Sequence, residues 1–336
     1  MPVRLRDVAD HAGVSIKTVS NVVNGYEHVS PAMRERVEAS LHRLNYRANL
    51  SARSLRRGRS GVIALAVPAL DMPYFAELTR YVVQEAEVLG YTVLVDQTDG
   101  LRAREEIVAA GIRSHLVDGL ILSPVSMDHA ELSRRGDETP IVLLGDKVGG
   151  TEMDHVAFDN VAVSRAATEH LLSLGRTRIA AIGYQAGAVA RSGVAAVRRA
   201  GYQAALRAAG IPLHPELTRQ VAGYGRGEGA AAMDSLLDER PDAVLCFNDQ
   251  LALGALRTLA VNGVRVPDDI AVIGIDDIED GRFSTPTLST VAPDKAAIAR
   301  EAVLALHQRL EDPSGPRREL SVGFELVARE STIGRT

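Results

Sequence analysis

The chain has 336 residues, 46% hydrophobic and 24% charged, which is long enough and apolar enough for two or three globular domains. Its single cysteine, Cys246, excludes an intrachain disulfide framework and is typical of a protein of the reducing cytoplasm. Because it contains neither an apolar run of about 18 residues nor an apolar signal segment, we expect a soluble, cytoplasmic protein with no membrane partner.

The net charge of −5 conceals an asymmetry along the chain. Residues 1–60 hold 11 Lys and Arg against 5 Asp and Glu, so this segment carries +6 and the remaining residues carry −11. A basic head on an acidic body favours contact with phosphates at one end only. A solvated basic face is the alternative, but the surplus of basic residues coincides with the helical motif in residues 6–24, which favours DNA contact.

Residues 6–24 predict two short helices joined at Gly13, the first over about 5–12 and the second from a Ser15 N-cap to about Asn24. Small and β-branched residues fall on the inner faces of the two helices, namely Val8, Ala9, Val14, Val19 and Val22. The outer face of the second helix carries Ile16, Lys17, Thr18, Ser20 and Asn21. A polar, hydrogen-bonding outer face suits a DNA major groove, so we predict a helix-turn-helix. A helical hairpin buried in a larger domain is the alternative.

A third helix is predicted to begin at Ser30 and Pro31, with serine as N-cap and proline at the first helical position. Residues 47–58 are rich in arginine and in helix formers, but an isolated helix of two turns is unstable in water. We therefore expect this segment to be disordered in the free protein and to fold on DNA. Leu55, an apolar side chain among arginines, predicts a wedge inserted between base pairs from the minor groove.

From Gly61 onward the pattern changes to alternating strands and helices. Short, apolar, β-branched runs predict buried parallel strands at 62–67, 92–96, 119–122, 141–144, 178–182, 243–247 and 270–275. Helical patterns lie between them, near 74–89, 101–114, 160–174, 194–209, 227–239, 249–262 and 294–310. This alternation predicts an α/β body with helices packed on parallel sheets, and the strand count suits two smaller sheets better than one.

Nothing in the sequence predicts catalysis. No Gly-x-Gly-x-x-Gly follows the first strand, and the Gly225–Gly229 stretch, which lacks a P-loop ending, is expected to be a loop. The adjacent carboxylates of Asp276 and Asp277 should point in opposite directions, so they cannot span one glycosidic bond at the ~5–9 Å that such chemistry needs. Cys246 lies in an apolar strand, where an inert buried thiol is expected. We predict no catalytic residue, no metal and no cofactor; a sugar-processing enzyme stays a remote alternative.

Polar and aromatic residues follow the predicted strands at their carboxyl ends, where parallel sheets bind ligands. Carboxylates, an arginine, an amide and aromatic rings suit a polyhydroxylated ring, because charged groups bind hydroxyls and aromatic rings stack on C–H faces. The predicted effector-binding residues are Asp71, Tyr74, Phe75, Asp146, Arg198, Tyr224, Asn248 and Asp276.

Several of these residues have simpler explanations. Asp249, which follows Asn248, is expected to cap the next helix. Asp276 and Asp277 could cap a helix or face solvent, and Arg198 could be a surface charge on an arginine-rich helix. Tyr74 and Phe75 could be core or dimer-interface residues.

The head and body together resemble the lactose-repressor (LacI/GalR) family of bacterial transcriptional regulators. The matching stretches are Asp7-Val8-Ala9, Ala12-Gly13-Val14-Ser15, Thr18-Val19-Ser20, Val22-Val23-Asn24, Val29-Ser30, Leu44-Asn45-Tyr46 and Asn49-x-x-Ala52-x-x-Leu55. By this resemblance Ile16, Lys17 and Asn21 occupy base-contacting positions, and Leu55 matches an intercalating leucine. Lys17 could donate to guanine and Asn21 could pair with adenine. The predicted DNA-binding set is completed by Leu5, Arg6, Ser15, Thr18, Ser20, Asn24, His28, Ser30, Tyr46, Asn49 and Ala52.

The resemblance also implies the domain organisation. It implies a helix-turn-helix head at 1–46, a hinge helix or linker at 47–60, and a periplasmic-binding-protein-like body of two lobes at 61–336. The first lobe is expected at about 61–159 and 292–320, and the second at about 160–290 and 322–336. Arg198, Asn248 and Asp276 match effector-pocket positions of the family. Pro293 and Lys295 depart from the lactose repressor, which has a pocket-lining amide and aromatic there.

These expectations define a DNA-binding transcriptional regulator, most simply a repressor. A small effector, expected to be a sugar or sugar derivative, binds between the lobes and switches affinity for a pseudo-palindromic double-stranded operator. The partners are the operator, the effector and a second copy of the chain in a homodimer, which is nucleoid-associated when bound to DNA. A purine- or nucleoside-responsive, co-repressed regulator of the same family is the alternative.

Overall fold

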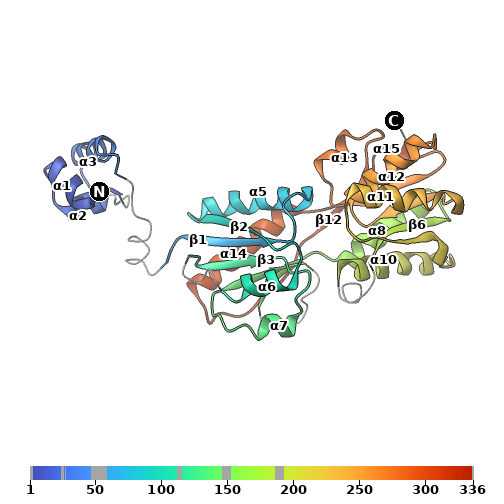
Figure 1. Ribbon diagram of the computed structural model, residues 1–336, viewed down its shortest axis with the longest axis horizontal. Helices are drawn as coiled ribbons and strands as arrows, with labels where there is room; N and C mark the ends of the chain where they lie inside the picture. Colours follow the sequence, from blue (N-terminus) through green and yellow to red (C-terminus); the bar gives the residue numbers. More distant parts are fainter. Residues whose placement is uncertain are drawn as a thin grey trace. The chain divides into compact units, whose positions relative to one another are not determined.

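The computed structural model describes residues 3–23, 26, 28–46, 59–111, 116–145, 153–185 and 193–334. The chain divides into two compact units, Met1–Ser60 and Gly61–Thr336, each with its own core. We call them the head and the body (Figure 1).

The head consists of three helices, α1 (Leu5–Ala12), α2 (Ile16–Val23) and α3 (Pro31–Arg43). Gly13 ends α1 in the left-handed region at φ 62°, which confirms the predicted corner. The Ser15 hydroxyl accepts a 3.1 Å hydrogen bond from the Thr18 amide, as expected of an N-cap for α2. Ser30 stands at the N-cap position of α3, but its side chain makes no capping hydrogen bond.

The head core is small and made mainly of alanine and valine. Its buried members are Val8, Ala9, Ala12, Val19, Val22 and Val37. Leu41 and Leu44 pack against this core from α3 and the turn after it. A core of this size supports three short helices with little stability to spare.

The body is built around two six-stranded sheets. The first contains β1 (Val62–Val67), β2 (Thr92–Gln97), β3 (Gly119–Leu122), β4 (Ile141–Leu144), β5 (Asp154–Ala157) and β11 (Glu319–Ser321). Its strands are all parallel, in the order β11-β5-β4-β3-β1-β2. The second contains β6 (Ile179–Tyr184), β7 (Thr218–Gln220), β8 (Ala243–Cys246), β9 (Ala271–Ile275), β10 (Ser289–Pro293) and β12 (Phe324–Val327). Its order is β12-β10-β9-β8-β6-β7, and only the β10–β12 pair is antiparallel.

Helices cover the sheets and define two lobes. Lobe 1 is the first sheet with α5 (Pro73–Val88), α6 (Arg102–Ala109), α7 (His129–Ser133) and α14 (Lys295–Glu311). Lobe 2 is the second sheet with α8 (Asn160–Ser173), α10 (Val194–Ala208), α11 (Arg226–Asp234), α12 (Asp249–Val261), α13 (Glu279–Phe283) and α15 (Glu330–Ile333), and with short 3-10 turns at Pro215–Leu217 and Leu237–Glu239. None of the helices in the described ranges is long and apolar enough to cross a membrane.

The chain passes between the lobes three times, after β5, after β10 and after β11. As a result α14, which is late in the sequence, packs against α5 among the early elements of lobe 1 (Figure 1). The second and third crossings touch, because the Asp294 amide donates a 3.2 Å hydrogen bond to the Gly323 carbonyl. Three adjacent crossings form a hinge between the lobes.

Two predictions of local structure, a glycine-rich loop and the end of a helix, are wrong. Gly227 and Gly229 belong to α11, as the helical pattern at 227–239 predicts, and not to the loop expected for Gly225–Gly229. A Cβ at Gly229 would lie 2.1 Å from the Leu251 carbonyl oxygen of α12, so this glycine lets the two helices pack closely. The helix expected at 101–114 ends at Ala109, before Gly111 at φ 72°.

Candidate functional site

The helix-turn-helix presents its predicted base-contacting side chains on α2. Lys17 is exposed, Asn21 is partly buried, and Ile16 is 45% exposed with no place in the head core. The Ser15 and Thr18 hydroxyls bond to each other at 2.9 Å, which fixes the start of this helix.

The other predicted DNA contacts fall into three groups. Arg6, His28 and Ser30 are exposed, and Ser20 is partly buried. Leu5 and Tyr46 pack against the head core, so part of each side chain has a structural role. Asn24, Asn49, Ala52 and Leu55 lie outside the described residues.

A cavity of about 380 Å³ is lined by residues of both lobes. It lies at the carboxyl ends of the parallel strands, because Pro68 follows β1, Ser123 follows β3, and Asn248 and Asp276 follow β8 and β9. Six of the predicted effector-binding residues line it, namely Tyr74, Phe75, Arg198, Tyr224, Asn248 and Asp276.

Arg198 and Asp276 form the charged part of the cavity wall. Arg198 is only 6% exposed, so it is not the surface charge considered as an alternative, and its Nη2 atom lies 3.6 Å from Asp276 Oδ1. Its Nε donates to Asn160 Oδ1 at 2.7 Å, and its Nη1 donates to the Phe247 carbonyl. Burial raises the pKa of Asp276 to about 6, although Arg198 and Lys295 oppose that shift.

Asn248 and Tyr224 are held against each other on the lobe 2 side. Asn248 caps α12, since its Oδ1 accepts from the Leu251 amide at 2.9 Å, and its Nδ2 donates to the Tyr224 carbonyl at 3.1 Å. The Tyr224 hydroxyl donates to the Gly183 carbonyl at 3.2 Å, and burial raises its pKa to about 12. Both side chains are therefore rigid where they meet the cavity.

The lobe 1 wall is mostly apolar and aromatic. Tyr74 and Phe75, in the first turn of α5, form an edge-to-face pair with ring centres 5.1 Å apart. Met72, Pro124, Val125 and Phe158 are among the other lobe 1 residues at the cavity.

Two predicted effector-binding residues are not among the described residues that line the cavity. Asp71 is exposed and does not line the cavity, because β1 ends at Val67 and the following turn carries residue 71 outward before α5 begins. Asp146 lies outside the described residues.

The expectation for Asp249 is wrong. Asn248 caps α12, while Asp249 is 1% exposed and accepts hydrogen bonds from Thr290 Oγ1 at 2.7 Å and from the Ile278 amide at 3.0 Å. It therefore ties α12 to β10 and to the segment after β9. Asp277 is buried as well, and its carboxylate accepts from Arg282 at 2.5 Å and from Arg329 at 2.6 Å, away from the cavity. Asp276 and Asp277 thus have separate partners, as expected of groups that cannot act as a catalytic pair.

Four polar residues at the cavity were not predicted, namely Asp99, Ser123, Asn160 and Gln185. Each comes within three residues of the carboxyl end of a strand. Asp99, Ser123 and Gln185 follow predicted strands, so the strand-end rule could have found them, but Asn160 follows β5, which was not predicted.

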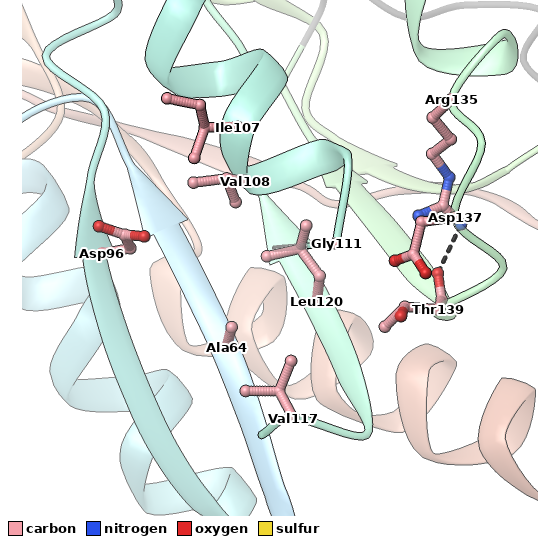
Figure 2. A pocket seen from close by; sticks show the side chains of 10 residues that line it. All are labelled: Ala64, Asp96, Ile107, Val108, Gly111, Val117, Leu120, Arg135, Asp137 and Thr139. Atoms are coloured by element: carbon pink, nitrogen blue, oxygen red, sulfur yellow. Dashed lines mark hydrogen bonds between the residues drawn. The ribbon is translucent and has the colours of Figure 1, made fainter. Parts of the chain in front are cut away.

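A second cavity lies in lobe 1 between α6 and the strands it covers (Figure 2). Asp96 of β2 and Arg135 stand on opposite sides of it, and Arg135 donates to the Thr139 carbonyl. Its volume of about 30 Å³ suits little more than a water molecule. This cavity is too small for a sugar or nucleobase.

Comparisons with known proteins agree with this geometry. Residues 4–49 match the model for bacterial regulatory proteins of the lacI family, and residues 168–332 match a periplasmic binding protein-like domain. The HTH-type transcriptional repressor PurR of Aliivibrio fischeri (strain MJ11) is 31% identical over 337 residues, which cover 98% of both chains. The chain belongs to the LacI family. The ribose operon repressor of Escherichia coli (strain K12) is 32% identical to this LacI-family chain over 331 residues, 97% of this chain and 99% of that protein.

Solved structures of the family extend the likeness to the fold. A LacI-family regulator from Sanguibacter keddieii is 46% identical and covers 82% of this chain and all of that one, with a TM-score of 0.74. A lac repressor dimer bound to operator and the anti-inducer ONPF is 31% identical over 99% of both chains, with a TM-score of 0.82. The transcriptional regulator CelR in complex with cellobiose is 30% identical, covers 98% of this chain and 99% of that one, and has a TM-score of 0.71.

These findings confirm the family, the two-part architecture and the regulatory function. This LacI-family chain is a DNA-binding transcriptional regulator with a ligand-binding body. Its relatives are regulators and repressors rather than enzymes, which agrees with the prediction of no catalytic activity.

Proposed function

We propose that the effector of this regulator is a sugar or sugar derivative bound in the cavity between the lobes. The observation that carries this proposal is the convergence of Arg198, Asn248 and Asp276 on one cavity whose opposite wall holds Tyr74 and Phe75. Fixed charged and amide groups bind hydroxyls, and aromatic rings stack on the C–H faces of a sugar. The relatives support a carbohydrate, since one is named for the ribose operon and another is solved with cellobiose.

A purine or nucleoside is the second candidate. It is favoured by the PurR of Aliivibrio fischeri (strain MJ11), which is 31% identical to this chain, against 32% for the ribose operon repressor. A planar base could stack on the same aromatic pair, with its edge bonded to Asn248 or Asp276. In this case the ligand would promote DNA binding rather than release it.

We further propose that the regulator acts as a homodimer on a pseudo-palindromic operator and is found at the nucleoid when bound. The effector favours one arrangement of the lobes, which changes the separation of the two segments that join bodies to heads. That separation decides whether residues 47–58 of both copies can fold together in the minor groove. Ile16, Lys17 and Asn21 would contact bases, and Leu55 would be the wedge.

The experiment is a thermal-shift screen of the full chain against pentoses, hexoses, cellobiose, nucleobases and nucleosides. A sugar that raises the melting temperature of the wild type but not of Asp276→Asn supports the proposal. Asp71→Asn, an exposed carboxylate beside the cavity, is the matched control and should respond like the wild type. Hits are then titrated into protein bound to an operator selected from random DNA. A stabilising sugar that leaves operator affinity unchanged would contradict the switch, and a response to nucleobases alone would favour the second candidate.

A further inference from the structure

Lys295 is a buried lysine at the point where the chain returns to lobe 1. It is the first residue of α14, directly after the second crossing, and is 8% exposed. Its Nζ donates to the Asp276 carbonyl at 2.7 Å and to the Asp277 carbonyl at 3.0 Å, and lies 2.5 Å from Glu77 Oε2. Three acceptors use the three donors of the ammonium group. Lys295 does not line the cavity, although the lactose repressor has pocket-lining residues at the positions of Pro293 and Lys295.

Glu77 completes a connection between the lobes. It belongs to α5 of lobe 1, within one turn of Tyr74 and Phe75 at the cavity. Its Oε2 holds Lys295, and its Oε1 accepts a 3.1 Å hydrogen bond from the Glu279 amide at the start of α13 in lobe 2. We call Glu77, Lys295 and the segment 276–279 the interlobe latch.

The segment that the latch holds has a strained backbone. Asp276 has φ 118° and Asp277 has φ 48°, and such positive values are uncommon for residues other than glycine. Such backbone conformations are unfavourable and persist where the surroundings hold them. The Lys295 ammonium holds both carbonyls, while Arg198 faces the Asp276 carboxylate from the other side. Asp276 is therefore held both at its backbone carbonyl and at the carboxylate that faces the cavity.

Apolar side chains could fill the space that the latch occupies at a lower cost in free energy. Removing an ammonium group from water has a large free-energy cost, and a buried ion pair often contributes no more stability than apolar residues of the same size. The ion pair itself lies within lobe 1. The bonds that cross to lobe 2 run from the Lys295 ammonium to two carbonyls and from the Glu279 amide to Glu77, so these bonds depend on the arrangement of the lobes.

We propose that Lys295 and Glu77 are positioning residues for the ligand site. They hold the strained 276–279 segment of lobe 2 against α5 of lobe 1, and thereby keep the Asp276 carboxylate directed at the cavity. Separation of the lobes withdraws Glu77, frees the segment and takes the Asp276 carboxylate out of register with Arg198. The binding site is thus assembled by lobe closure rather than merely enclosed by it. This inference rests on the cavity being the effector site but not on which ligand it binds.

The test is hydrogen–deuterium exchange of the full chain without ligand, comparing wild type, Glu77→Gln and Lys295→Met. We expect exchange to rise about tenfold or more in residues 276–281, with no change in α12, whose contacts lie within lobe 2. Lys295→Arg keeps a cationic donor and should retain most of the protection. Arg165→Ala is the control, because its ion pair with Glu169 is exposed and lies within a single helix.

Two results would overturn the proposal. One is unchanged exchange in residues 276–281 of Glu77→Gln, a lobe 1 substitution that should loosen lobe 2. The other is a uniform rise through lobe 2, which is general destabilisation and not release of a latch. Because no ligand is added, the result does not depend on whether the effector is a sugar.

Discussion

The Nε atom of Arg198 donates a 2.7 Å hydrogen bond to Oδ1 of Asn160, and both side chains are buried at the cavity. Asn160 is the first residue of α8, directly after the chain first crosses from lobe 1 to lobe 2. The arginine that faces Asp276 is therefore oriented by a residue of the hinge. This bond connects the first crossing to the charged part of the cavity.

Asn160→Ala should weaken effector binding by roughly tenfold to a hundredfold, because a hydrogen bond to a charged group is worth about 1.5–3 kcal/mol. Isothermal titration with the ligand identified in the screen measures the change. Asn262→Ala removes an amide bonded to the Thr258 carbonyl at the far end of α12 and should bind as the wild type does. Equal affinity in the two variants would show that Asn160 does not orient Arg198.

Stability of the body should fall as the pH rises between about 4 and 7. Burial, with Asp276 nearby, raises the pKa of Asp249 to about 7, and burial raises that of Asp276 to about 6. A carboxyl group with a raised folded-state pKa binds its proton more tightly when folded. Its contribution is therefore fully present below the unfolded pKa and is lost as the pH passes the folded value.

Asp249→Asn should flatten this dependence, because the uncharged amide can accept from the Ile278 amide through its oxygen and donate to Thr290 Oγ1 through its nitrogen. The measurement is the free energy of unfolding in urea at about pH 5 and pH 8 for both proteins. A wild-type curve parallel to that of the variant would mean that Asp249 does not titrate in this range.

Gly183→Ala should destabilise the body by about 2 kcal/mol or more, since overpacking and a strained backbone act together. Gly183 has φ 130°, and a Cβ there would lie 2.4 Å from the Cβ of Phe247. Gly323→Ala is the control, because nothing lies within 4 Å of a Cβ at that site and its φ is not positive. Thermal unfolding of the two variants compares them directly, and similar melting temperatures would refute the steric argument.

Val95→Glu should convert the proposed homodimer to a monomer. β2 is an edge strand, and apolar side chains are exposed on it and on the helices of lobe 1: Val83, Val88, Leu94, Val95 and Ile107. Such a surface is typical of an interface, and a second copy fits because a relative is solved as an operator-bound dimer. Sedimentation velocity gives the mass. Val261→Glu, equally apolar and 65% exposed on α12, should leave it unchanged. A dimeric Val95→Glu protein would place the interface elsewhere.

Asn21→Ala should relax base preference at one operator position by about 1–3 kcal/mol, the value of a good side-chain contact to a base edge. Arg53→Ala, in the segment outside the described residues, should instead weaken binding to all sequences and lessen its salt dependence. Selection from random DNA and titration at several salt concentrations separate the two effects. An unchanged selected-site profile for Asn21→Ala would exclude this residue from base recognition.

The regular elements were largely predictable because they follow local rules. The Gly13 corner, the Ser15 cap and the apolar strands β1, β3, β4, β8 and β9 depend on residues that are close in sequence. β5 was missed because Asp154 and His155 interrupt its apolar pattern. Both are buried, and Asp154 pairs with Arg309 of α14 at 2.9 Å. A buried carboxylate that is neutralised by an arginine 155 positions later leaves no local signature in the sequence.

The position of the site, at the carboxyl ends of the strands, was predictable from the sequence, but the contacts that each side chain makes there were not. The rule that ligands bind after parallel strands found Asn248 and Asp276, yet it could not decide between Asn248 and Asp249 as the cap of α12. It also included Asp71, which the turn before α5 carries out to the surface. Lys295 was noticed as a departure, but its burial behind Asp276 depends on how three separate segments meet.

The two edge strands that complete the sheets come from one short stretch near the end of the chain. β11 (Glu319–Ser321) closes one side of the lobe 1 sheet, and β12 (Phe324–Val327) closes one side of the lobe 2 sheet. During synthesis, therefore, neither lobe can finish folding before residues 319–327 have left the ribosome, although the head emerges some 270 residues earlier. A nascent chain carries a head with its own core well before a complete body exists to regulate it.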